Sequence, residues 1–168
     1  GCRRGGYRIE PEGYVCHNRT ATLDREHPVA RLSSTRPYMG GLPYTYVKSR
    51  YPTPPLYARL PTDEQQRKVE PSLEGHVRKH RALAAKPSFT AFPAPDPIPA
   101  LLGTGEVIPG LGGQNRGRNR ITLGHARVRS GFALLGTYDH GGRRFGLTTE
   151  LAVLPLDRTR VVAPSQLS

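Results

Sequence analysis

The fold of this chain is decided by the stretch FALLGTYDHGGRRFGLTT, residues 132–149. An apolar run is followed by turn-forming residues 139–142, and a second run with apolar residues comes after them. Two such runs about a glycine pair are typical of a β-hairpin. Further short apolar runs follow at residues 151–154 and 160–162. Short strands at close spacing favour a small β-barrel, and the sequence therefore predicts a C-terminal β module over residues 130–168.

The beginning of the chain has the same character on a smaller scale. Short alternating runs on either side of residues 11–13, Pro-Glu-Gly, predict a second β-hairpin. Tyr7, Ile9 and Val15 are expected to face a small core. Residues 1–30 are therefore interpreted as a small β module.

Two cysteines, Cys2 and Cys16, lie within this first module. A disulfide between them would close a loop of about 15 residues and contribute about 3 kcal/mol in the chain-entropy model. An even number of cysteines in a small module with little core favours an oxidising compartment. The alternative is two unpaired thiols. A zinc site is not expected, because His17 beside Cys16 leaves the other ligand pair missing, and no cofactor is predicted.

The next segment, residues 31–61, is rich in proline and tyrosine. Proline fixes φ and removes backbone donors, which predicts extended chain. The segment is interpreted either as a strip that wraps over a partner or as a linker, and its many aromatic residues favour the strip. The tyrosines proposed to make contacts are Tyr44, Tyr46, Tyr51 and Tyr57.

Residues 62–86 are predicted to be helical. Thr62 is a suitable N-cap, and Gln65 completes a capping box. Because a helix does not continue smoothly through Pro71, a second helix is expected from residue 72 to about residue 85. This second helix carries a basic face, which is either a contact for a polyanion or a solvated surface. Its members are His76, Lys79, His80 and Arg81.

Residues 87–129 are predicted to be irregular because proline and glycine recur throughout them. A long loop of this kind is either functional or disordered. The whole chain carries a formal net charge of +12, which favours polyanionic partners. Basic residues around the glycine-rich part of the loop make nucleic-acid binding an alternative function. These residues are Arg116, Arg118, Arg120, Arg127 and Arg129.

Motifs for catalysis are missing from the chain. The sequence contains no P-loop, no Gly-x-Ser-x-Gly elbow and no His-Glu-x-x-His zinc motif. Cys16 and His17 are adjacent in a predicted strand, so their side chains would point to opposite faces, which works against a catalytic dyad. The sequence also shows no signal peptide and no membrane span.

Three stretches resemble one family. Residues 50–57, RYPTPPLY, and residues 144–158, RFGLTTELAVLPLDR, resemble the region that precedes the catalytic domain in L,D-transpeptidase-like proteins of myxobacterial type. Residues 6–16, GYRIEPEGYVC, resemble the final strands of a bacterial SH3-like module in the same proteins.

This resemblance implies an exported cell-envelope protein, periplasmic or lipid-anchored through a segment outside this chain, that acts on peptidoglycan or is held against it. The family's nucleophile is the cysteine of a Ser-His-Gly-Cys motif, and that motif is absent here. No catalytic residue is carried over. The chain is therefore expected to be a non-catalytic N-terminal region, inactive alone, whose full-length parent is an L,D-transpeptidase with its active site beyond Ser168.

The prediction as a whole is a mostly β fold with a short helical segment, in which small SH3-like barrel modules are joined by irregular chain rich in proline and glycine. The expected task is to bind or position peptidoglycan, or to dock an adjacent catalytic domain. The tyrosines of residues 31–61 would stack on sugars or pack on a partner. Arg143 and Arg144 would bind carboxylates of the peptidoglycan stem peptide as bidentate donors. For each of these residues, a place on the surface or in a minor core is the alternative.

Overall fold

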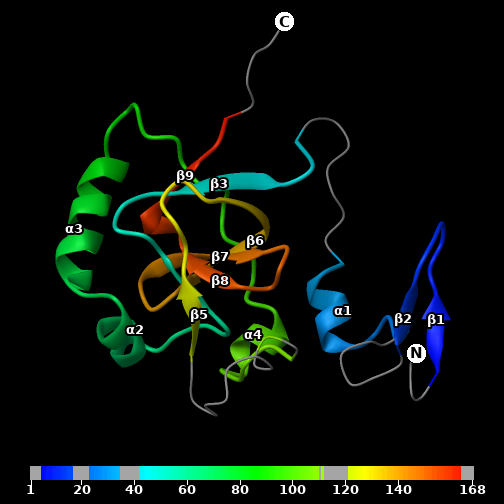
Figure 1. The fold of residues 1–168 in the computed structure, drawn as a ribbon. Helices are drawn as coiled ribbons and strands as arrows, with labels where there is room; N and C mark the ends of the chain where they lie inside the picture. Colours follow the sequence, from blue (N-terminus) through cyan, green and yellow to red (C-terminus); the bar gives the residue numbers. More distant parts are fainter. Residues whose placement is uncertain (1–4, 17–22, 35–41, 110, 112–120, 164–168) are drawn as a thin grey trace, which may run out of the picture.

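The computed structural model describes residues 5–16, 23–34, 42–109, 111 and 121–163. It has one two-stranded and one seven-stranded antiparallel sheet with a few short helices, which confirms the prediction of a mostly β fold (Figure 1). The strands are β1 Gly6–Arg8, β2 Tyr14–Cys16, β3 Thr45–Ser49, β4 Pro55–Tyr57, β5 Thr122–His125, β6 Gly131–His140, β7 Arg143–Thr148, β8 Val153–Pro155 and β9 Thr159–Val161. The helices are α1 Pro28–Leu32, α2 Asp63–Val69, α3 Leu73–Ala84, α4 Ala100–Gly103 and the 3-10 turn η1 Leu156–Arg158.

The larger sheet has the strand order β5-β4-β8-β7-β6-β3-β9. Along the chain, β3 leads into β4, and β5 leads into β6. The two segments run antiparallel to each other, because β3 pairs with β6 and β4 pairs with β5. Backbone hydrogen bonds continue the pairing between them: Ser49 N–H donates to Ser130 O at 2.9 Å, and Ala126 N–H donates to Pro54 O at 3.0 Å. Closure of the described strands into a barrel is not found, so an SH3-like barrel is not shown.

The hairpin β6–β7 is the one expected from residues 132–149. Its register pairs His140 with Arg143 across the turn. Gly141 and Gly142 have φ values of 56° and 70°. Positive φ at both central residues is the requirement of a type I′ turn, whose twist matches that of the flanking strands. Glycine at these two positions therefore fixes the register of the central hairpin.

The apolar residues of the sheet form two buried clusters. The first is centred on Tyr57 and Phe145, whose rings meet edge to face with centroids 6.4 Å apart. The second contains Val47, Leu134, Leu154 and Leu156. Helices α1 and α4 add Leu32 and Leu102 to the first cluster, so both helices pack on the core of the sheet.

The helical segment forms as the sequence predicts. Thr62 Oγ1 accepts a hydrogen bond from Gln65 N–H, and Gln65 Oε1 accepts one from Thr62 N–H, which is the capping box. Helix α2 ends at Val69, before Pro71, and α3 begins at Leu73. In the part of the chain that the structure describes, no helix is long and apolar enough to cross a membrane.

The N-terminal hairpin is present, with Tyr7 opposite Val15. The small core expected between its strands is not formed, because Ile9 and Val15 are 43% and 37% exposed. Two strands of three residues cannot cover a core by themselves. Cys16 is disulfide-bonded, and Cys2, the partner predicted for it, lies outside the described residues.

In the middle of the chain, the secondary structure and strand pairing differ from those predicted for residues 31–61 and 87–129. Residues 31–61 are not a strip beside the C-terminal module, because β3 and β4 belong to the same sheet as β6 to β9. Residues 87–129 are not wholly irregular, since they contain α4 and β5. The proline-rich part packs along β6, where Asp96 N–H donates to Thr137 O at 2.7 Å. Long-range strand pairing, which local patterns do not report, accounts for both differences.

Candidate ligand-binding groove

A buried network of charges fixes α2 against the sheet. Glu70 follows the last residue of α2, and its side chain is 1% exposed. Its carboxylate accepts hydrogen bonds from Tyr57 Oη at 2.7 Å, from Arg143 at 2.9 Å and 3.1 Å, and from Arg158 Nε at 2.5 Å. A carboxylate with three charged or polar donors is well compensated for the loss of water.

Arg143 connects this network to the end of the sheet. Its guanidinium also binds both carboxylate oxygens of Asp157, at 2.7 Å and 2.9 Å, and the amide oxygen of Gln66 at 2.7 Å. Burial by itself would lower the pKa of Arg143, but Glu70 and Asp157 more than offset this effect and raise the pKa above its ordinary value. The network therefore holds two arginines against two carboxylates.

Asp157 extends the network to α3. His76 Nε2 lies 3.3 Å from Asp157 Oδ2 and 3.1 Å from the backbone oxygen of the same residue. Burial opposes the ionised form of Asp157, but the contacts with His76 and Arg143 prevail and lower its pKa. Because His76 is thereby fixed to η1, the face of α3 that carries it is held at a defined position against the sheet.

That face of α3 lines a pocket of about 460 Å³. The opposite wall comes from the connection between β3 and β4, with Arg50, Tyr51 and Pro52, and from Asp157 of η1. The helix contributes residues spaced by three and four positions, which lie on one side of an α-helix. They are His76, Lys79, His80 and Leu83.

A second pocket, of about 500 Å³, continues from the first. Arg50 and Leu83 line both pockets, so the two pockets adjoin each other. The second part runs along the edge of the sheet, where Lys48 of β3 and Arg160 of β9 are opposite each other in register. Phe89, in the chain after α3, also lines this part. We call the two pockets together the basic groove.

The cations of the basic groove have no carboxylate partner in the part of the chain that the structure describes. Among the described residues, no acidic side chain lies within 4.0 Å of the charged groups of Lys48, Arg50, Lys79 or Arg160. The acidic residue in the lining is Asp157, whose charge is engaged by Arg143. Unpaired cations beside a hollow surface attract anionic groups and steer them toward it.

The histidine pair of the groove adds hydrogen-bonding capacity. The Nε2 atom of His80 is buried and has no hydrogen-bond partner within the described residues. Burial lowers the pKa of His80, an effect that Asp157 partly opposes. The ring also meets Phe89 edge to face, with centroids 5.6 Å apart. His80, in the first pocket, is therefore packed against Phe89, which lines the second.

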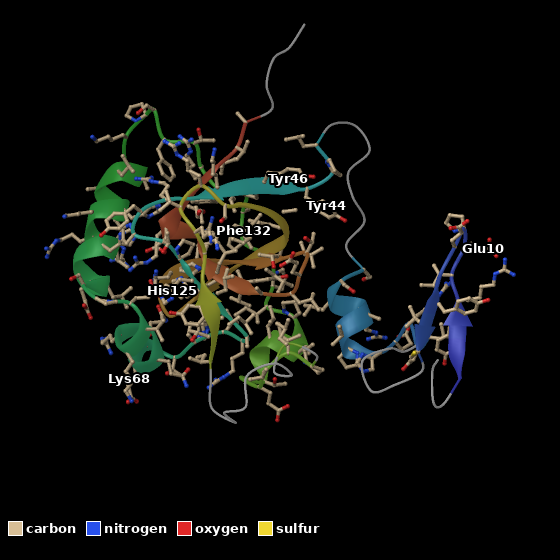
Figure 2. All side chains as sticks on the ribbon, in the orientation of Figure 1. Glu10, Tyr44, Tyr46, Lys68, His125 and Phe132 are labelled. Carbon is tan, nitrogen blue, oxygen red and sulfur yellow. The ribbon has the colours of Figure 1, made fainter. Side chains whose placement is uncertain are left out.

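The structure separates the four tyrosines that were predicted to make contacts. Tyr51 is 84% exposed and lines the groove. Tyr44 and Tyr46 are half-buried at the other end of β3, away from α3 (Figure 2). Tyr57 is fully buried and donates to Glu70, so it is a structural residue. Of the four, the structure brings Tyr51 to the groove.

The two arginines predicted to bind a ligand's carboxylates bind carboxylates of this chain instead. Arg143 is 7% exposed and engaged by Glu70 and Asp157. Arg144 is paired with Asp139, with Nε 2.9 Å from Oδ1. Each arginine makes a bidentate contact, Arg143 with Asp157 and Arg144 with Asp139, and both carboxylates belong to this chain.

The alternative nucleic-acid interface falls largely outside the described residues. Arg116, Arg118 and Arg120 lie there, while Arg127 and Arg129 are exposed in the connection between β5 and β6. The basic face predicted for the second helix is divided by the structure. His76, Lys79 and His80 line the basic groove, whereas Arg81 lines a different pocket.

Sequence patterns did not indicate Lys48, Arg50 or Arg160 as site residues. Lys48 and Arg50 lie in β3 and directly after it, whereas Arg160 lies in β9, and the pairing of β3 with β9 brings these two segments together. The local pattern that indicated groove residues was helical spacing, which predicted that His76, Lys79 and His80 lie on one face of α3.

Comparisons with known proteins add no relative. No protein-family model matches the chain, and no match is found among curated proteins or solved structures. The function of the groove is therefore argued from its own geometry.

Proposed function

We propose that this chain is a non-catalytic binding module of a cell-wall protein similar to the L,D-transpeptidases, and that it holds peptidoglycan in the basic groove. The observation that carries the proposal is the set of unpaired cations along the groove, Lys48, Arg50, Lys79 and Arg160. Peptidoglycan presents carboxylates on its stem peptides and sugar rings on its glycan strand, and the groove offers partners for both.

The first partner is charge. Arg50 lies where the two pockets of the groove meet, so a carboxylate bound there is within one continuous surface with Lys79 on one side and Arg160 on the other. Charge-assisted hydrogen bonds of this kind are about twice as strong as neutral ones. Tyr51 supplies the second partner, because an exposed aromatic face beside such a site suits stacking on a sugar ring.

The remaining features of the proposal concern fold and location. Short antiparallel strands, with β3 leading into β4 along a bent course, support an SH3-like module. The disulfide-bonded state of Cys16 supports an exported protein of the cell envelope. The groove also suits an acidic surface of an adjacent catalytic domain, in which case the module would dock that domain against the cell wall.

The experiment is co-sedimentation of the chain with isolated peptidoglycan. We expect Arg50→Glu and Lys79→Glu each to weaken binding about tenfold or more, because each replaces an attraction by a repulsion. Lys68→Glu is the matched control. It makes the same change of charge at an exposed position of α2 outside the groove (Figure 2), and we expect it to bind like the unaltered chain.

Two further samples separate the alternatives. Peptidoglycan whose carboxylates have been amidated should no longer bind, whereas binding through sugars alone would persist. A single-stranded oligonucleotide tests the nucleic-acid alternative, whose affinity would fall steeply with salt. Oligonucleotide binding that exceeds peptidoglycan binding, or equal binding by the groove and control variants, would overturn the proposal.

A further inference from the structure

A separate pocket lies on the other side of α3. It is an open pocket with a volume of about 450 Å³, lined by α2, α3 and the turn between β6 and β7. Helix α3 contributes Glu74, Val77, Arg78 and Arg81, which again follow helical spacing. None of these residues lines the basic groove, so the two sites share the helix and no lining residue.

The pocket carries unpaired charges of both signs. Asp63 of α2 and Arg78 of α3 line it, and neither has an ion-pair partner among the described residues. The other pair of opposite charges, Arg67 and Glu74, is joined at 3.0 Å. Arg81 also lines the pocket without a carboxylate partner among the described residues, so Asp63 is the free carboxylate beside two free arginines. A molecule that carries a positive and a negative group satisfies charges of both signs.

The rest of the lining is apolar or already fixed. Leu73 and Val77 provide an apolar wall. Arg81 donates to the backbone oxygen of Gly142 at 3.3 Å, which ties α3 to the turn. Arg143 lines the pocket as well, and its buried Nε has no hydrogen-bond acceptor within the described residues. A buried donor without an acceptor is costly unless a water or a ligand supplies one.

Glycine in the turn leaves room for the side chain of Asp63. Gly141 has a positive φ, and a Cβ atom at this position would lie 2.6 Å from Asp63 Oδ1. Asp63 Oδ1 is otherwise contacted by Gln66 Nε2 at a long distance of 3.4 Å. The side chain of Asp63 therefore occupies the space beside the turn, and its carboxylate accepts one long hydrogen bond, from Gln66, and has no ion-pair partner among the described residues.

We propose that this pocket binds a zwitterionic amino acid or short peptide with a free amino group, a free carboxylate and an apolar side chain. The ammonium group contacts Asp63, the carboxylate contacts Arg78, and the side chain packs on Leu73 and Val77. The site is distinct from the basic groove and does not depend on the function proposed for it.

The test is titration of the whole chain with the dipeptide leucyl-leucine, followed by nuclear magnetic resonance or calorimetry. N-acetyl-leucyl-leucine and leucyl-leucine amide, which each lack one charge, serve as matched probes. We expect each blocked probe to bind about tenfold more weakly than the free dipeptide, since each loses one charge-assisted contact.

Two substitutions test which residue contacts the amino group of the dipeptide and which contacts its carboxylate. Asp63→Asn should weaken binding of the free dipeptide about tenfold and leave binding of the N-acetyl probe unchanged. Arg78→Gln should also weaken binding of the free dipeptide about tenfold, and it should leave binding of leucyl-leucine amide unchanged. Lys79→Glu, in the basic groove, should leave all three affinities unchanged. The absence of saturable binding, equal affinity for free and blocked dipeptides, or a loss caused by Lys79→Glu would overturn the proposal, and none of these results would bear on peptidoglycan binding.

Discussion

Replacement of Glu70 by glutamine is the most direct test of what holds α2 and α3 to the sheet. The substitution preserves the size of the side chain but removes its charge, so Arg143 and Arg158 lose a shared counter-ion. Removing one partner of a buried ion pair costs about 3–5 kcal/mol. The upper part of that range is expected here, because the new amide group would place its own donors against a guanidinium that is 97% buried at Arg158.

A loss of this size is a large share of the 5–15 kcal/mol that stabilises a typical domain. Urea unfolding followed by circular dichroism should show a lower midpoint with an unchanged slope, and the melting temperature should fall by roughly 6–20 °C. Glu64→Gln, at an exposed ion pair of the same helix, is the control and should lower the free energy of unfolding by less than about 1 kcal/mol. A loss below about 1 kcal/mol, the value of a surface ion pair, would refute the reasoning.

A second variant keeps this prediction testable if the first does not fold. Glu70→Gln combined with Arg158→Met removes one cation together with the carboxylate. Because an apolar replacement of a buried pair is often neutral or stabilising, the double variant should be more stable than Glu70→Gln alone. If the double variant is less stable than the single one, the stability lost in Glu70→Gln does not come from uncompensated charge on Arg158.

Three further substitutions test other parts of the fold. Thr62→Ala removes the capping box of α2 and should cost about 1 kcal/mol in urea unfolding. Gly146→Ala should cost about 1–3 kcal/mol in the same assay, because its Cβ would lie 2.9 Å from the side chains of Leu134 and Leu156. The pKa of Asp157 is below its ordinary value of 3.8 in the folded chain, so the stability it contributes is present above pH 3.8 and is lost as the pH falls through the folded value. Asp157→Asn should remove this part of the acid dependence, measured as unfolding midpoints between about pH 5 and pH 2.

The parts of the fold that the sequence predicts are those governed by local chemistry. The Gly141-Gly142 turn requires positive φ at both residues, and few residues other than glycine allow it. The capping box at Thr62 needs two residues three positions apart. The single sheet that joins β3 and β4 to the C-terminal strands was not predicted, because it depends on pairing between segments far apart in the sequence, such as Val47 with Phe132 and Val161.

In the candidate site, too, the sequence indicates the residues that share a local pattern and misses those that only the tertiary structure brings together. Helical spacing gathers His76, Lys79 and His80 on one face, and the sequence alone indicates this. The sequence does not indicate whether an arginine is buried or exposed. Arg143 and Arg160 look equivalent as residues in strands, yet Arg143 meets Glu70 in the interior while Arg160 is exposed along the groove. The difference comes from where Glu70 lies in space, which no pattern of neighbours along the chain reports.

Asp157 links the stability of the module to the charge of its groove. It lines the groove, where a free carboxylate would neutralise the neighbouring cations and weaken the attraction for an anionic ligand. Arg143 engages both of its oxygens from the interior, so the carboxylate contributes little repulsion and instead holds His76 in place. Glu70 also contributes little repulsion, because its carboxylate is paired with the buried arginines Arg143 and Arg158. A perturbation of the network should therefore weaken ligand binding even where the chain stays folded, because release of Asp157 from Arg143 would both free a negative charge in the groove and loosen the helix that carries Lys79.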